Sequence, residues 1–269
     1  MGFLCIMKRF ILLIVSIFAM FVAKAQMAFV PADSVVFWGQ DATNIKNVAM
    51  GICPSFKDIV SAAVVKDDLA SLEQRWAKQK MALHAEAKIK GYKVADQFYL
   101  AAQLLSVAQD AKYARAIEQL VFFPLTQCVA TSEDAAEKYV AAQALYNAVS
   151  TMFGTAQQAF YINYYANSSA FVHSGDLVFQ VDVMTAMPYE RRVKLRFSRV
   201  KPKGGIRFKV FLQLPEGDWS CKTLPVYCNG HDVDYKMERG YAVVENNWQS
   251  GFEIYFDLPT PLYADEENP

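Results

Sequence analysis

Cysteines are the most reactive side chains in this sequence, because a deprotonated thiol is both a nucleophile and a metal ligand. After the N-terminal apolar stretch the chain keeps Cys53, Cys128, Cys221 and Cys228. Zinc sites with the usual ligand spacing are absent, and no acid stands two residues before Cys128. A lone cysteine on an apolar helix is more often a core residue than a nucleophile. The sequence therefore predicts no catalytic residue, no metal site and no cofactor.

Two of these cysteines can form a disulfide. Cys221 and Cys228 flank a short connection, Lys222 to Tyr227, and adjacent strands would bring them within bridging distance. An oxidising compartment would preserve such a bridge. The alternative is a pair of free, buried cysteines.

Carboxylates offer a different chemistry, the acid and base of a glycosidase. The candidates are Asp182, Glu190, Glu238 and Glu245, all in the strand-rich half of the chain. The separation of the two carboxyl groups decides that mechanism, and the sequence does not give it. A solvated strand face is the simpler interpretation.

Aromatic side chains form the remaining binding signal, since a flat apolar ring can stack on a sugar. We predict Tyr161, Tyr165, Trp219 and Trp248 as ligand-binding residues. Neighbouring residues of a strand face opposite ways, so either Tyr161 and Tyr165 or Phe160 and Tyr164 can face a ligand. Core packing is the competing interpretation, because aromatic residues fill the interiors of sandwiches.

The elements that must position these residues change near Gly154. Before it, apolar residues recur at helical spacing. Capping residues, glycines and Pro124 divide this part into helices. The predicted helices run from 67 or 68 to 91, from 95 to 108, from 111 to 124, and from 131 or 132 to 154.

From Ala159 the apolar period becomes two, as in Ile206 to Leu214, and turn residues recur between the runs. The sequence predicts an α+β protein. A short antiparallel helical domain, residues 26–156, precedes an antiparallel, jelly-roll-like β-sandwich, residues 157–269.

Residues 1–25 have the pattern of a signal peptide. Lys8 and Arg9 precede an apolar run from Phe10 to Val22, and Ala23-Lys24-Ala25 suits signal peptidase. We expect cleavage before Gln26 and a periplasmic or secreted protein without stable membrane insertion. An uncleaved anchor is the alternative. With 27 basic and 27 acidic residues and no basic stripe, the chain is not expected to bind nucleic acid.

Sequence landmarks of the strand-rich half stand in a characteristic order. They are FYINYY at 160–165, LQLP at 212–215, WSC at 219–221, VYCNG at 226–230, GY at 240–241, Trp248, and GFEIYFDLP at 251–259. In order and spacing they resemble the β-sandwich part of glycoside hydrolase family 127, the β-L-arabinofuranosidase-like proteins. The resemblance covers only Ala159 to Pro259.

That family implies a cysteine nucleophile beside a zinc ion, with ligands from a Glu-x-Cys segment and a Cys-Cys pair. The sequence contains neither element. The helix that should open with the paired cysteines opens instead around Ala136 to Tyr139. Residues 26–158 have room for only about four or five helices of ordinary length, too few for the catalytic barrel of the family.

We therefore expect an exported, noncatalytic carbohydrate-associated protein, a reduced relative of family 127 glycosidases that binds glycan or assists a partner hydrolase. The alternative is a divergent glycoside hydrolase that acts on arabinofuranosides or related sugars through carboxylates. A third hypothesis is a structural protein whose helix from Asp68 to Lys90 completes the bundle of another subunit.

Overall fold

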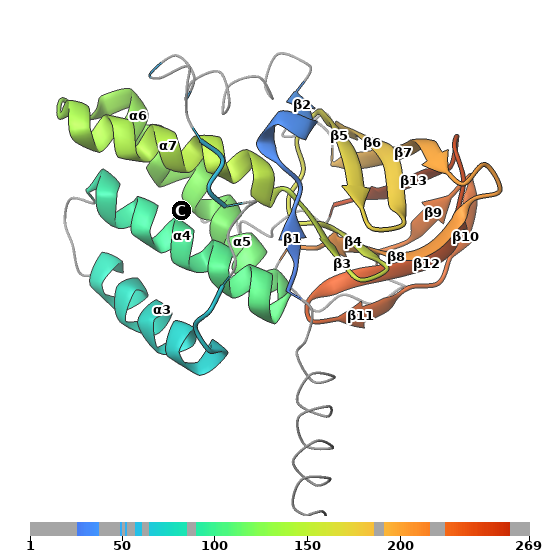
Figure 1. Ribbon diagram of the computed structural model, residues 1–269, viewed down its shortest axis with the longest axis horizontal. Helices are drawn as coiled ribbons and strands as arrows, with labels where there is room; N and C mark the ends of the chain where they lie inside the picture. Colours follow the sequence, from blue (N-terminus) through green and yellow to red (C-terminus); the bar gives the residue numbers. More distant parts are fainter. Residues whose placement is uncertain are drawn as a thin grey trace, which may run out of the picture.

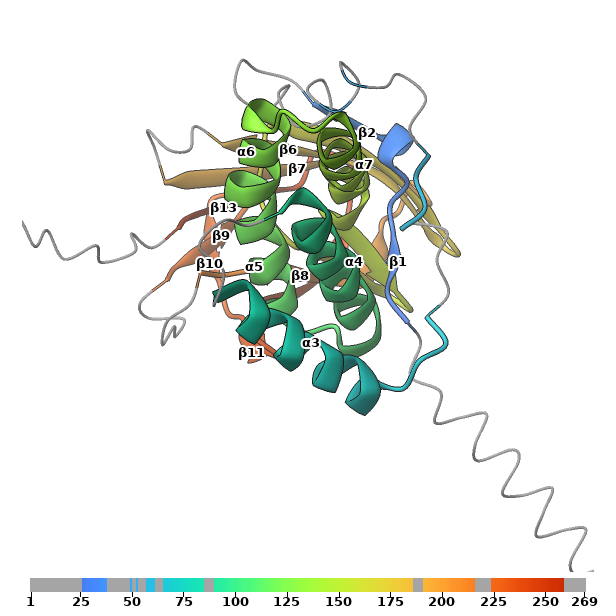
Figure 2. The ribbon, with the colours of Figure 1, turned by 90° about the vertical axis from the view of Figure 1, so that its left-hand side faces the viewer.

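The protein has a helical side and a β-sandwich side. The computed structural model describes residues 26–37, 49, 52, 57–60, 65–84, 90–185, 191–215 and 224–258. Helices lie together at one end, and two β-sheets stack at the other (Figure 1). A view from the helical end shows helices in front of the sheets (Figure 2). The predicted α+β class with a β-sandwich is confirmed.

A π-helical turn interrupts the helical part at Val121–Leu125. Pro124 lies in this turn and has no N–H to donate, so regular α-helical hydrogen bonding cannot continue through it. The predicted interruption of the α-helix at Pro124 is confirmed, but the chain does not leave the helical conformation there, because the π-turn leads directly into a further short helix at Thr126. The α-helices are α3 (Leu69–His84), α4 (Gly91–Ala108), α5 (Ala111–Leu120), α6 (Thr126–Thr131) and α7 (Ala135–Thr151).

Helix ends differ from the predictions by a few residues. Helix α7 is capped by Asp134, whose carboxylate accepts from the backbone N–H of Ala136 at 2.8 Å, and not by Thr131 or Ser132. It ends at Thr151, before Gly154. Gly154 lies in a strand, where a Cβ would collide with the Met27 side chain, so the glycine permits close strand packing and does not stop the helix.

Two sheets form the sandwich, in the orders β1-β3-β4-β8-β12-β11 and β10-β9-β13-β7-β6-β5-β2. Strand pairs are antiparallel except β4 with β8, which is parallel. The first sheet contains β1 (Ala28–Phe29), β3 (Phe153–Ala156), β4 (Ala159–Ile162), β8 (Ile206–Gln213), β11 (Lys236–Glu238) and β12 (Tyr241–Trp248). The second contains β2 (Val35–Phe37), β5 (Ser168–Ser174), β6 (Leu177–Thr185), β7 (Arg192–Lys201), β9 (Val226–Cys228), β10 (His231–Val233) and β13 (Glu253–Asp257).

The N-terminal segment belongs to the sandwich. Strand β1 pairs with β3, and β2 pairs with β5, so this segment adds an edge strand to each sheet. Both strands lie on the helical side of the domain boundary that the sequence suggested. The sequence did not predict these two strands, because two and three residues are too few to show the alternation of a strand.

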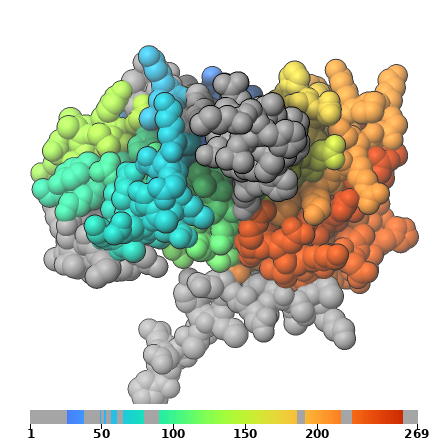
Figure 3. Space-filling view, turned by 60° about the horizontal axis from the view of Figure 1, so that its bottom comes forward, coloured from blue at the N-terminus to red at the C-terminus, as the bar shows by residue number. Residues whose placement is uncertain are grey.

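The sandwich interior is aromatic. Phe179 packs on Phe208 with ring centroids 5.1 Å apart, and Phe197 packs on Trp248 at 4.8 Å. Buried residues of the helices and of the sheets form one continuous hydrophobic core. In the space-filling view, green helical residues lie directly beside the orange residues of the C-terminal strands (Figure 3). Among the described residues, no helix is both long and apolar enough to cross a membrane.

Candidate functional site

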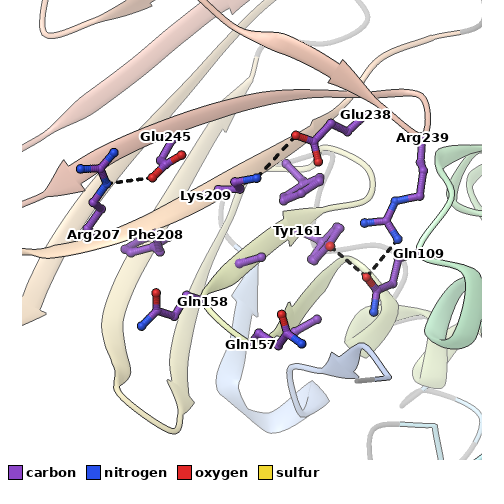
Figure 4. A pocket seen from close by; sticks show the side chains of 13 residues that line it. Gln109, Gln157, Gln158, Tyr161, Arg207, Phe208, Lys209, Glu238, Arg239 and Glu245 are labelled. Atoms are coloured by element: carbon purple, nitrogen blue, oxygen red, sulfur yellow. Dashed lines mark hydrogen bonds and ion pairs between the residues drawn. The ribbon is translucent and has the colours of Figure 1, made fainter. Parts of the chain in front are cut away.

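A polar pocket of about 480 Å³ lies where the six-stranded sheet meets the helices, and we call it the junction pocket. Its walls come from the link between α4 and α5, the β3–β4 turn, and strands β4, β8, β11 and β12 (Figure 4). The lining residues with polar side chains are Gln109, Gln157, Gln158, Tyr161, Arg207, Lys209, Glu238, Arg239 and Glu245.

The turn between β11 and β12 holds the two halves of the molecule together at this pocket. The backbone oxygen of Arg239 accepts from the N–H of Ala111 at 2.9 Å. The Arg239 Nη1 donates to the carbonyl of Ala108 and to Oε1 of Gln109, both at 3.2 Å. Gln109 ends α4 in a left-handed conformation with φ of 52°. The pocket thus lies where a strand turn is hydrogen-bonded to a helix link.

Tyr161 forms the floor of the pocket. Its ring stacks on Phe211 with a centroid distance of 4.2 Å, and its hydroxyl donates to Gln109 Oε1 at 3.1 Å. Burial raises the pKa of Tyr161, and the nearby Arg239 opposes that rise. The phenol is therefore neutral at physiological pH and acts as a hydrogen-bond donor that orients the Gln109 amide.

Cross-strand ion pairs form the charged wall. Arg207 on β8 donates to Glu245 on β12 at 2.8 Å, and Lys209 on β8 lies 3.5 Å from Glu238 on β11. The hydrogen bond from Arg207 lowers the pKa of the Glu245 carboxyl. All four side chains are more than one third exposed, so the pairs add little stability, and both charges of each pair stay accessible to a ligand on the pocket wall.

A second hollow, of about 670 Å³, adjoins the junction pocket and shares Gln158 and Arg207 with it. It lies among the β5–β6 and β7–β8 turns, with Asp176 and Lys201 on its walls. The shared wall residues place the two hollows next to each other.

The three predicted aromatic binding residues that the structure describes do not form one exposed binding surface. Tyr161 lines the junction pocket, but the residue is only 2% exposed. Tyr165 lies beyond the end of β4, so strand alternation no longer relates it to Tyr161; its hydroxyl donates to the Gln213 carbonyl at 2.8 Å. Trp248 is fully buried and donates to the Phe208 carbonyl at 2.9 Å, so its ring cannot stack on a ligand. Trp219 lies outside the described residues.

Two of the four candidate carboxylates do meet. Glu238 and Glu245 both line the junction pocket. Asp182 lies on β6 of the other sheet, where it accepts from Ser169 Oγ at 2.6 Å. Glu190 lies outside the described residues.

The described cysteines take no part in the pocket. Burial and the charge of Glu137 raise the pKa of the Cys128 thiol, which disfavours the reactive thiolate. Cys228 is a free, buried thiol 3.6 Å from Asn246 Nδ2. Cys221 lies outside the described residues, so the Cys221–Cys228 disulfide is not seen in the structure and stays a prediction. Among the described residues, no group of three or more potential ligands could hold a metal ion.

Sequence reasoning missed Gln109 and Arg239 as site residues. Arg207 and Lys209 lie within the run from Ile206 to Leu214, which the sequence predicted as a strand but not as part of a site. These four residues share only their position in the fold: Gln109 and Arg239 lie in links between elements, and the other two lie on the exposed face of a strand. Only the pairing of β8 with β12 and the docking of the β11–β12 turn bring them together.

The comparisons with known proteins point to one family for part of the chain. The family model described as "Beta-L-arabinofuranosidase, GH127 middle domain" matches residues 159–260. This match confirms the resemblance seen in the sequence landmarks. A comparison with curated proteins finds no match.

Solved structures show a likeness of fold. The chain is similar to a glycoside hydrolase with 18% identity and a TM-score of 0.55, over 64% of this chain and 33% of that one. It is similar to a GH127 β-arabinofuranosidase with 14% identity and a TM-score of 0.53, over 63% of this chain and 32% of that one. It is also similar to a GH127 β-L-arabinofuranosidase from Geobacillus stearothermophilus T6, with 16% identity and a TM-score of 0.50, over 64% of this chain and 32% of that one. At these identities the likeness concerns the fold, and the chain spans about a third of the length of each structure.

Proposed function

We propose that the protein is an exported, noncatalytic carbohydrate-associated protein that binds glycan in the junction pocket. The observation that carries the proposal is a concave, polar pocket on a scaffold similar to part of a sugar-cleaving enzyme. Exposed amides of Gln157 and Gln158 and the charged groups of Arg207 and Lys209 can donate to and accept from sugar hydroxyls.

The two carboxylates of the pocket are suited to binding. A glycosidase needs one carboxylic acid that stays protonated, with a raised pKa, beside a second carboxylate. Glu245 is held by Arg207 with its pKa lowered, and Glu238 is paired with Lys209. A carboxylate with a lowered pKa, such as Glu245, accepts hydrogen bonds from hydroxyl groups but is a poor proton donor to a leaving group.

The adjoining hollow favours an oligosaccharide over a single sugar. The shared wall at Gln158 and Arg207 allows a chain bound in the junction pocket to continue toward Lys201. We expect affinity to rise with chain length until both hollows are filled, and then to level off.

A glycan array probed with the protein from residue 26 onward tests the proposal. We expect a restricted set of glycans to bind, and we expect Lys209→Ala to weaken binding about tenfold by removing a donor and freeing Glu238. Lys194→Ala is the matched control, because Lys194 forms a 2.8 Å ion pair with Glu253 on the other sheet, away from the pocket. Absence of binding to every glycan, or equal losses in both variants, would remove the proposal.

The presence of two carboxylates in one pocket is the specific observation in favour of a divergent glycoside hydrolase. The two functions separate in one assay. Aryl arabinofuranosides and related aryl glycosides are incubated with the protein and with its Glu238→Gln and Glu245→Gln variants. Hydrolysis that either single variant abolishes would establish the hydrolase, whereas the binding proposal expects no release of the aryl group.

A further inference from the structure

The junction pocket has one more cation than it has carboxylates. Arg207 is paired with Glu245 and Lys209 with Glu238, which leaves Arg239. Among the described residues, Arg239 forms no ion pair. The adjoining hollow does not change this balance, since its further charges, Lys201 and Asp176, are of opposite sign.

Arg239 is held in place by neutral acceptors. Its Nη1 donates to a backbone carbonyl, of Ala108, and to an amide oxygen, of Gln109. Both contacts involve the same nitrogen, while a guanidinium carries five N–H donors arranged as a planar fork. The side chain is half-buried, so water screens its charge less than that of a fully exposed arginine.

A carboxylate is the group that such a fork recognises best, because two parallel N–H···O bonds can form at once. We propose that the glycan bound in the junction pocket is acidic, and that Arg239 binds the carboxylate of a uronic acid residue. This inference rests on the proposed function, and it adds the charge class of the ligand. A neutral glycan would leave the Arg239 charge without a partner in the pocket.

Isothermal titration of the protein with a matched pair of ligands tests the inference. One ligand is a short oligogalacturonide, and the other is its methyl ester, which keeps the sugar rings and removes the charge. We expect the acid to bind about tenfold more tightly than the ester. The difference should shrink as salt is raised, because the contact is ionic.

Variants of two arginines locate the effect. Arg239→Gln should abolish the preference for the acid, and Arg239→Lys should keep part of it, since a lysine keeps the charge and loses the fork. Arg199→Gln is the matched control. Arg199 also has a left-handed backbone, with φ of 53° against 50° for Arg239. Its guanidinium lies over the Phe171 ring, outside the pocket. This control should leave the preference unchanged. Melting temperatures measured in parallel show that each variant folds.

The outcomes separate the inference from the proposed function. Equal binding of acid and ester by the unmodified protein, or a preference that survives Arg239→Gln, would overturn the acidic-glycan inference and leave glycan binding intact. Failure of both ligands and of all neutral glycans to bind would overturn the proposed function itself.

Discussion

At the scale of single residues, charge partners decide what each titratable group can do. Glu245 accepts a hydrogen bond from Arg207, and its pKa falls. Glu118 on α5 has the opposite environment: burial raises its pKa to about 7, and Arg115 only partly opposes the rise. Cys128 was considered as a nucleophile in the sequence, and a core position was favoured instead. Its thiol has a raised pKa and lies outside the pocket.

Glu118 predicts a dependence of stability on pH. Its folded pKa of about 7 lies above the ordinary value of 4.5, so the folded state holds the proton more tightly than the unfolded state. The resulting stabilisation is full below pH 4.5 and is lost as pH rises through 7. We expect Glu118→Gln to raise the free energy of unfolding at pH 8 by about 1–3 kcal/mol, with little change at pH 4.

Denaturant titrations at the two pH values measure this effect, and Glu245→Gln provides a control of opposite sign. The pKa of Glu245 is lowered, so its stabilisation is present at neutral pH and fades as pH falls. The control variant should therefore lose some stability at pH 8 and none at low pH. Equal effects of Glu118→Gln at pH 4 and pH 8 would show that the carboxyl does not titrate as described.

At residue scale, sequence reasoning found the carboxylates of the site but not their partners. Side-chain chemistry marks Glu238 and Glu245 as candidates in any sequence. The distance between the two carboxylates depends on the register of β12 against β8. In this register Glu245 lies opposite Lys209 and Val243 lies opposite Phe211, and the whole sheet sets it. Trp248 was predicted to bind a ligand, but it is buried in the core. The sequence cannot distinguish the two cases, because large aromatic side chains occur both in cores and at binding surfaces.

At the scale of elements, the contact between the β11–β12 turn and the α4–α5 link places the pocket. Gly240 in this turn has φ of +77°, a conformation that side chains disfavour. A Cβ at this position would also lie 3.0 Å from the Ala111 Cβ, at the start of α5. The turn can therefore approach the helix link only because it carries a glycine there.

Gly240→Ala should destabilise the protein more than Gly230→Ala does. Gly230 has a similar φ of +83° in the β9–β10 turn, but a Cβ there would meet nothing within 4 Å. Backbone strain is common to both variants, so the excess loss, about 1–2 kcal/mol, measures the crowding against Ala111. Thermal or chemical unfolding of the pair gives this difference, and equal losses would mean that the turn does not need its close approach.

Element prediction succeeded where the periodic run was long. The helices α3, α4, α5 and α7 and the strands β7 and β8 were expected near their observed positions, because each repeats its apolar spacing. The six-residue helix α6 was not expected, since it is too short to show a period. Helix ends shifted because several residues near 131–134 can serve as caps, and the structure uses Asp134. Strands β1 and β2 were missed, since their stability comes from pairing with β3 and β5.

At the scale of the whole molecule, helices and sandwich share one core. The N-terminal strands extend both sheets before the chain enters the helices, and the strand-rich half then returns to pair with them. Buried residues of α4, α5 and α7 are continuous with those of the sheets. The two parts that sequence periodicity separates are therefore packed as one unit.

We expect a single cooperative unfolding transition. Calorimetry of the protein from residue 26 onward should give a calorimetric enthalpy equal to the van't Hoff enthalpy, as for one cooperative unit. A chain that begins at residue 157 lacks β1, β2 and β3 and should not fold alone. Two resolved transitions, or a stable folded fragment 157–269, would contradict a shared core.

Export is a separate expectation for the whole molecule. The apolar run at Phe10 to Val22 followed by Ala23-Lys24-Ala25 predicts a mature protein that begins at Gln26. N-terminal sequencing of protein recovered from cell fractions checks this. Recovery of the uncleaved chain with the membrane fraction would favour an anchor instead.

The most direct measurement is a crystal structure of the protein soaked with the glycan that binds it best. We expect an intact oligosaccharide in the junction pocket, in contact with Lys209 and with its acidic group on Arg239. A glycan bound elsewhere, such as on the stacked Tyr227 and Tyr255 rings of the other sheet, or one cleaved between Glu238 and Glu245, would contradict it.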